Sequence, residues 1–324
     1  MYICPVCSGG LAAVPEERRL ACDKGHSFDI ARAGYVSLTL GSRSRPTGDT
    51  AAMVRARAEF LSTGLYEPIA RAVTEVVREV LGLAGEPRRL SQEPEAPASN
   101  PHGSPPYNPS DLNTPTPRHP GAERQDLRLA PPPDTTNPPS YLLVDLGGGT
   151  GWYSAYILNR LPELSGVLID ASVPAATRAA RAHPRLSVAT ADVWGVIPLR
   201  TGAADVALVV FAPRHPAEIA RILAPGGTCV VVTPEPDHLG ELRAVLPLGI
   251  EPDKDVRLAE QFAEFERVGT WVVRYEAEFD PAAIAAAVAM GPGAYHHPPA
   301  EAVDPGVTAR TVTVAVRLSA YRHP

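Results

Sequence analysis

The segment Val144-Asp145-Leu146-Gly147-Gly148-Gly149-Thr150-Gly151 follows a short apolar run and precedes residues with helical spacing. A glycine-rich turn between a strand and a helix exposes backbone N–H groups at the carboxyl end of the strand, where a ligand can bind. The dinucleotide-binding fingerprint would need its third glycine at position 152, which is Trp152. The segment therefore predicts a ligand-binding loop with a different spacing, and an ordinary tight turn is the alternative.

Short apolar runs alternate with helical patterns on both sides of this loop, which is the rhythm of β-α-β units. The expected strands are Tyr141 to Leu146, Gly166 to Asp170, Leu186 to Ala189, Val206 to Phe211 and Thr228 to Thr233, with Trp271 to Phe279 and Thr311 to Ala320 closing the sheet. Helices are expected after Trp152, from about Pro174 and from Pro216 to Leu223. This order predicts an α/β fold with a Rossmann-like doubly wound sheet.

Glycines at 147, 149 and 151 after Asp145 resemble motif I of the class I methyltransferases, which use S-adenosylmethionine. Asp170 ends the next strand, where a carboxylate can accept both ribose hydroxyls or can cap the following helix. Asp192 follows the third strand and suits the adenine amino group, unless it belongs to a surface turn. Ala224-Pro225-Gly226-Gly227 resembles the turn after the fourth helix of these enzymes. The ordered set predicts a methyl-donor site more specifically than any one member.

The first 26 residues contain a C-x2-C pair and a C-x3-H pair, separated by fourteen residues. The four predicted zinc ligands are Cys4, Cys7, Cys22 and His26. Three thiolates and one imidazole complete a tetrahedral set with no position open for water, so the site is expected to be structural. Free thiols beside a surface histidine are the alternative. Zinc would also stabilise a segment too small to form a sufficient core.

The region between this module and the sheet predicts two helices and a linker. Apolar spacing indicates helices from Thr50 to about Leu61, with Asp49 as a cap, and from Tyr66 to about Leu83. Residues 86–140 contain 15 of the 36 prolines and no periodicity, which predicts a disordered insertion. The expected organisation is a zinc-binding module at 1–40, a helical connector at 41–85, this insertion, and a methyltransferase domain at 141–324.

Several further motifs resemble the RlmA family of 23S rRNA guanine-N1 methyltransferases along the whole chain. They are Gly25-His26-Ser27-Phe28-Asp29, Gly34-Tyr35-Val36-Ser37-Leu38, Gly48-Asp49-Thr50, Ala56-Arg57-Ala58, Gly64-Leu65-Tyr66-Glu67-Pro68, Phe211-Ala212-Pro213-Arg214 and Thr233-Pro234-Glu235-Pro236-Asp237-His238-Leu239. Asp145 to Gly151, Ala191-Asp192-Val193-Trp194 and Met290-Gly291-Pro292 are most similar to the Gram-positive, tylosin-resistance branch. The insertion at about 86–140 departs from the family pattern, which has a much shorter connection there.

The resemblance implies zinc at the four residues above and S-adenosylmethionine contacts from Tyr66, Gly149, Thr150 and His238. From the residues alone, Tyr66 is expected in core packing and His238 in a loop. The resemblance also implies a guanine in a domain II hairpin of 23S rRNA, or of a large ribosomal subunit precursor, as the substrate. It further implies a homodimer and a contribution to resistance against tylosin-type macrolides.

Methylation at guanine N1 requires a group that accepts the N1 proton. The sequence identifies no base; candidates are His238, His296 and His297, with Arg214 stabilising guanine O6. Tyr295 is a candidate for stacking on the base, whereas Trp194 is expected in the core, with stacking as its alternative. The basic residues near the zinc module, which are either a phosphate-binding patch or a solvated face, are Arg18, Arg19, Lys24, Arg32, Arg43 and Arg45.

Composition limits the remaining function classes. The net charge of -6 gives no global attraction to RNA, and the longest apolar runs, such as Val206 to Ala212, are too short to span a bilayer. Without a secretory signal at Met1, a cytoplasmic protein with no membrane partner is expected. A small-molecule methyltransferase and a non-catalytic RNA-binding protein that senses the cofactor are the rival functions, because a fold does not determine function.

Overall fold

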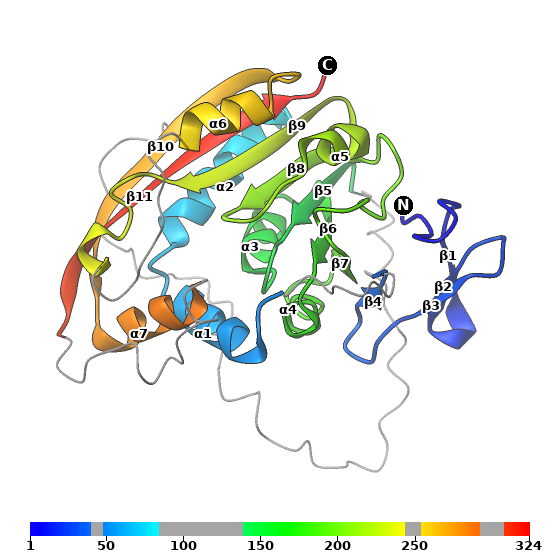
Figure 1. Ribbon diagram of the computed structural model, residues 1–324, viewed down its shortest axis with the longest axis horizontal. Helices are drawn as coiled ribbons and strands as arrows, with labels where there is room; N and C mark the ends of the chain where they lie inside the picture. The colour runs from blue at the N-terminus through cyan, green and yellow to red at the C-terminus, as the bar shows by residue number, and fades with distance from the viewer. Residues whose placement is uncertain (40–47, 84–138, 244–253, 292–307) are drawn as a thin grey trace, which may run out of the picture.

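The computed structural model describes residues 1–39, 48–83, 139–243, 254–291 and 308–324 (Figure 1). The predicted insertion, except its last two residues, lies outside these ranges, as do Arg43, Arg45, Tyr295, His296 and His297. Within the described part of the chain, no helix has the length and apolar character needed to cross a membrane.

An eight-stranded sheet forms the centre of the molecule, in the order β10-β11-β9-β8-β5-β6-β7-β4. Its strands are β4 (Val36–Ser37), β5 (Tyr141–Leu146), β6 (Leu164–Asp170), β7 (Leu186–Thr190), β8 (Ala204–Val210), β9 (Leu223–Pro234), β10 (Glu266–Phe279) and β11 (Arg310–Arg322). Strands β4 to β9 are parallel to one another. β11 pairs antiparallel with β9, and β10 pairs antiparallel with β11. After β7 the chain crosses to the other side of β5 to form β8. The gap between β5 and β8 is therefore the topological switch point, where ligands bind in such sheets.

Helices cover both faces of this sheet, which confirms the doubly wound architecture. One core cluster joins the sheet to α1 (Ala51–Ser62), α2 (Glu67–Val80), α3 (Trp152–Arg160), α4 (Val173–Ala179) and α7 (Pro281–Met290). The other joins the opposite face to α5 (Pro216–Ile222), α6 (Lys254–Gln261) and the N-terminal module. The alternation of buried residues along β5 explains the two clusters, because Leu143 faces one and Val144 the other.

The predicted strands of the sheet and the two connector helices are present, with ends shifted by a few residues. The prediction that Asp49 caps α1 is wrong: the Thr50 side chain accepts the Met53 backbone N–H at 3.3 Å. The predicted turn at Ala224 to Gly227 is part of β9, where the register against β8 shifts.

The N-terminal module is a three-stranded antiparallel sheet whose end joins the large sheet. Its strands are β1 (Ala12–Val14), β2 (Arg19–Ala21) and β3 (Ser27–Asp29), and Pro15–Glu17 forms a short 3-10 helix, η1. A second 3-10 helix, η3 (Gly240–Leu242), follows β9. β4 then pairs in parallel with β7 through Val36 and Ser37. Tyr2 also bridges to Leu199, so the module is attached to the large sheet at two places. The division of the chain into four segments stays a prediction.

Candidate methyl-donor and zinc sites

The four predicted zinc ligands converge in the N-terminal module. The donor atoms of Cys4, Cys7, Cys22 and His26 all lie within 4.8 Å of one another. The Sγ atoms of Cys7 and Cys22 are 3.7 Å apart, and Cys22 Sγ lies 3.4 Å from His26 Nδ1. Thiolates bound to one tetrahedral zinc at about 2.3 Å would be about 3.8 Å apart. The donor set therefore fits a structural zinc ion.

The glycine loop begins directly at the end of β5 and leads into α3. Gly147, Gly149 and Gly151 have φ angles of 69°, 57° and 75°, which glycine adopts without the steric penalty of a side chain. A Cβ on Gly148 would lie 2.5 Å from Asp145 Oδ2, so this position also excludes a side chain. These glycines thus keep the turn free of side chains at the switch point, where the sequence predicts a ligand-binding loop.

Asp145 lies beneath this loop as a buried carboxylate. Ser154 Oγ donates a hydrogen bond of 2.5 Å to Asp145 Oδ2, whereas Oδ1 finds no partner among the described residues. Burial raises the pKa of Asp145 to about 7, against the Ser154 hydrogen bond, and the charge of Asp170 adds to the shift. A buried carboxylate with a free oxygen favours a positively charged or hydrogen-donating ligand next to it.

Asp170 connects the glycine loop to the end of β6. Its Oδ2 accepts the Gly149 N–H at 2.9 Å, and its Oδ1 accepts the Ser172 N–H at 2.7 Å. Burial raises the pKa of Asp170, while these two backbone hydrogen bonds oppose the rise. The Asp192 carboxylate accepts the Trp194 N–H at 2.9 Å in the turn after β7. Each carboxylate retains acceptor capacity for a ligand hydroxyl or amino group.

Tyr66 and His238, far apart in sequence, are joined at the other end of the site. Tyr66 Oη lies 3.0 Å from His238 Nε2, and both residues are only 4% exposed. The Ala315 N–H donates to His238 Nδ1 at 3.2 Å, which places the proton of the neutral imidazole on Nε2. Tyr66 Oη then accepts from His238 and can donate its own proton to a further acceptor. Phe211, at the end of β8, lies against both rings.

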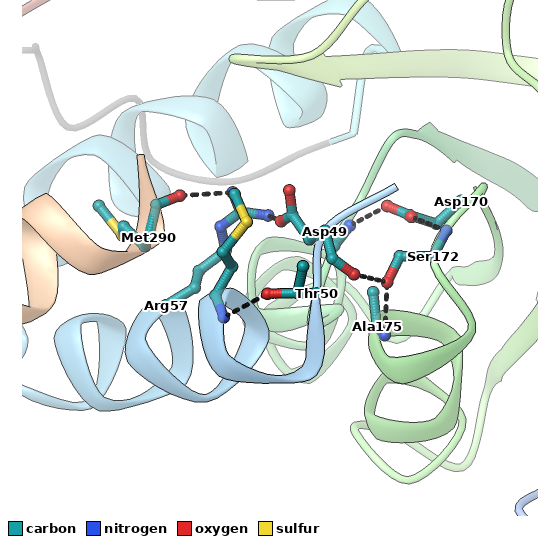
Figure 2. Close-up of polar contacts among 9 residues, drawn as sticks. Asp49, Thr50, Arg57, Asp170, Ser172, Ala175 and Met290 are labelled. Carbon is teal, nitrogen blue, oxygen red and sulfur yellow. Dashed lines mark hydrogen bonds and ion pairs between the residues drawn. The ribbon is translucent and has the colours of Figure 1, made fainter. Parts of the chain in front are cut away.

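Arg57 of α1 lies between Asp49 and Met290, as Figure 2 shows. It forms an ion pair with Asp49 and donates to the Met290 carbonyl at 3.2 Å. A Cβ on Gly149 would lie 3.1 Å from Arg57 Nη1. The backbone carbonyl of Asp49 accepts the Ser172 hydroxyl at 2.7 Å, so α1, α7 and the loop after β6 meet at this point. A guanidinium next to the glycine loop suits a carboxylate.

The structure does not bring all predicted candidates together. Arg214 Nε donates to Gln261 of α6 at 2.9 Å, and Cys229 and Tyr321 are close enough to influence the Arg214 guanidinium. Trp194 is 61% exposed, so the expectation that it packs in the core is wrong. His296 lies outside the described residues.

Three residues near the site were not singled out from the sequence as functional. Arg57 and Phe211 stood inside motifs shared with the resembling family, which was the only available signal. The Tyr153 hydroxyl is buried without a partner among the described residues, and burial raises its pKa, with Tyr66 adding to the shift. No local pattern could separate Tyr153 from an ordinary core tyrosine in α3.

Comparisons with known proteins extend along nearly the whole chain. A family model described as the RlmA N-terminal zinc ribbon matches residues 2–39. The 23S rRNA (guanine(748)-N(1))-methyltransferase of Streptomyces fradiae is 40% identical over 326 residues, covering 98% of this chain and 95% of the relative. A Micromonospora griseorubida protein named for 23S rRNA (guanine-N(1)-)-methyltransferase activity is 37% identical, covering 98% and 96%. Among solved structures, YcgJ of Bacillus subtilis matches 57% of this chain and 92% of its own, at 13% identity and a TM-score of 0.41.

Proposed function

Because the chain belongs to the family of RlmA-type 23S rRNA (guanine-N1)-methyltransferases, we propose that it transfers the methyl group of S-adenosylmethionine to N1 of a guanine in 23S rRNA. The observation that carries this proposal is the glycine loop between two buried carboxylates, Asp145 below it and Asp170 hydrogen-bonded to it. This arrangement lies in the same chain as a complete zinc-ligand set.

We assign the donor site to residues at the carboxyl ends of β5, β6 and β7. Asp170 would hold the ribose hydroxyls and Asp192 the adenine amino group, while Gly147, Gly149, Thr150 and Gly151 line the loop. Asp145 Oδ1, which has no partner among the described residues, suits the cationic end of the donor. Arg57 suits the carboxylate of the methionine portion, because its guanidinium lies next to Gly149 and has donors beyond those used by Asp49 and Met290. When bound, S-adenosylmethionine supplies an electrophilic methyl group on a sulfonium.

Tyr66 and His238 belong to the donor site in this proposal, and His238 acts as a positioning residue. Its Nδ1 already accepts the Ala315 N–H, and its Nε2 contacts Tyr66 Oη. An imidazole engaged in this way is a poor acceptor for the N1 proton. The pair fixes the Tyr66 hydroxyl for the donor instead. In this proposal neither Tyr66 nor His238 is the base that accepts the proton from guanine N1.

The zinc module is proposed to contribute to RNA binding, with the metal as its structural support. Tetrahedral coordination by four protein ligands leaves no open position for chemistry. Arg18, Arg19, Lys24 and Arg32 are the described basic residues of this module. A guanine in a hairpin loop is the expected target, because N1 is blocked in a paired helix and proteins read unpaired bases. We propose a domain II hairpin as that target, a homodimer as the active form and tylosin-type resistance as a consequence.

A methyl-transfer assay tests the proposed function against its rivals. Purified protein and labelled S-adenosylmethionine are incubated with naked 23S rRNA, with large ribosomal subunits or with cell metabolites, and the modified base is mapped by primer extension. A stop at one guanine is expected, since an N1 methyl group blocks base pairing. Label entering metabolites would identify a small-molecule enzyme, whereas donor binding without any transfer would favour a non-catalytic RNA-binding protein.

A further inference from the structure

Phe211 lies at the topological switch point, directly beside the glycine loop. It follows Val210, the last residue of β8, and its N–H donates to the Val232 carbonyl of β9 at 3.1 Å. A Cβ on Gly147 would lie only 2.7 Å from the Cβ of Ala212. The turn that begins at Phe211 is therefore in close contact with the turn that begins at Gly147.

The Phe211 backbone adopts a conformation that is costly for a bulky residue. Its φ angle is 52°, in the left-handed region that asparagine, aspartate and glycine normally occupy. Backbone strain of this kind persists when the surrounding structure imposes it, and it concentrates at functional sites. Here the strand hydrogen bond to Val232 and the contact of Ala212 with the glycine loop fix the turn.

The Phe211 ring is supported from within the protein and open to solvent. It stacks on the His238 ring at 5.9 Å between centroids with an interplanar angle of 26°, and its centroid lies 6.2 Å from that of Tyr66. Tyr66 and His238 are buried, yet Phe211 is 41% exposed. The two inner residues thus hold an exposed aromatic surface in a fixed orientation next to the donor loop.

We propose that Phe211 is the surface on which the target guanine stacks, an inference that rests on the function proposed above. Unpaired bases commonly stack on aromatic side chains, and such stacking accepts any purine because it uses the face of the ring. A base on Phe211 would lie beside the loop that holds the methyl donor. The hydrogen-bonding edges of the guanine, including N1, would remain free of the stacking contact.

Kinetics of Phe211 variants test this role. Relative to the wild type, Phe211→Ala is expected to lower kcat/KM for 23S rRNA about 5- to 100-fold, the loss that removal of one base-stacking contact corresponds to. Phe211→Trp should restore most of the activity, whereas Phe211→Leu, which keeps apolar bulk without an aromatic face, should not. Binding of S-adenosylhomocysteine, measured by calorimetry, should change little in all three. Val272→Ala, which alters an exposed apolar residue on β10, is the control.

A second measurement reports stacking directly. A substrate hairpin with 2-aminopurine in place of the target guanine should show quenched fluorescence with wild type and Phe211→Trp, and not with Phe211→Leu. Equal kcat/KM for the wild type, Phe211→Leu and Phe211→Ala would overturn the inference, as would loss of S-adenosylhomocysteine binding in Phe211→Leu, which would place the ring in the donor site. Absence of methyl transfer by the wild type would instead refute the proposed function.

Discussion

Two features of Asp145, its burial and its unsatisfied oxygen among the described residues, destabilise the free protein. Its carboxylate is fully buried, and only one of its two oxygens has a partner among the described residues. Leaving a buried acceptor unsatisfied costs about 1 to 3 kcal/mol, and more when the group is charged. A cationic ligand beside Oδ1 would offset this cost. The residue therefore stabilises the bound state at the expense of the free protein.

The pH dependence of stability tests the environment of Asp145. Its pKa of about 7 exceeds that of the unfolded chain, so its contribution to stability is complete at low pH and is lost as the pH rises to about 7. Between pH 5.5 and pH 8 the wild type should lose about 2 kcal/mol more free energy of unfolding than Asp145→Asn. Urea denaturation of both proteins at the two pH values measures this difference. The exposed-residue control Glu79→Gln should follow the wild type, and parallel curves for Asp145→Asn would contradict the prediction.

Arg57 provides a test of how the donor is oriented. If its guanidinium pairs with the donor carboxylate, Arg57→Ala should weaken S-adenosylmethionine binding about 10- to 100-fold, the range for a hydrogen bond to a charged group. Decarboxylated S-adenosylmethionine should bind the wild type weakly and should lose little further affinity in the variant. Arg160→Ala, which removes an exposed arginine paired with Glu67, is the matched control in calorimetry. Equal losses for both ligands would show that Arg57 acts only through Asp49 and Met290.

At the scale of elements, the sequence predicted those strands and helices that have a clear hydrophobic pattern. The strands β5 to β9 are short runs rich in apolar residues, and their alternation with helical patterns identifies them as buried strands. Helix α7 was not predicted, because Pro281 to Met290 is apolar on all sides and shows no amphipathic period. The choice between Asp49 and Thr50 as a cap depends on tertiary contacts, since Arg57 engages the Asp49 carboxylate.

The same distinction, between local sequence patterns and long-range contacts, applies to the residues of the candidate site. The glycine loop, Asp170 and the zinc ligands follow from spacing within short segments. Tyr66 and His238, by contrast, meet across 172 residues, so only the resemblance to a family could connect them before the structure did. Trp194 was misplaced because large aromatic residues are usually buried, and its exposed turn has no local signal.

The start of helix α1 is fixed to the donor site by a close backbone approach. A Cβ on Gly48 would lie 2.6 Å from the Ser172 backbone nitrogen, which neither segment can relieve by moving a side chain. Gly48→Ala should therefore reduce the free energy of unfolding by about 1 to 3 kcal/mol and weaken donor binding, because Asp49 and Arg57 move away from the loop. Gly240→Ala, at a glycine with open space around it, should leave both unchanged. Thermal denaturation and calorimetry measure the two effects, and unaltered donor affinity in Gly48→Ala would refute the linkage.

On the scale of the whole molecule, the zinc module and the catalytic sheet share backbone hydrogen bonds. The Ile3 N–H donates to Pro198 at 3.0 Å, and the Leu38 N–H donates to Thr190 at 2.9 Å. Leu20, Ile30 and Val36 also belong to the core cluster that covers one face of the sheet. The module is thus seated next to the loop that carries Asp192 and Trp194. Loss of the metal should disturb this edge of the sheet first.

Removal of zinc should separate RNA methylation from donor binding. Without the metal, the small sheet of the module has too little core to remain folded. A strong chelator, or Cys7→Ser, should abolish hydrogen-exchange protection at residues 19–38 and reduce methylation of 23S rRNA, while β5 and β6 stay protected and S-adenosylhomocysteine still binds. Added zinc should reverse the effect of the chelator. Ser27→Ala, an exposed change in the same module, should behave as the wild type. If protection at residues 19–38 survived chelation, packing against the large sheet rather than the metal would hold the module in place.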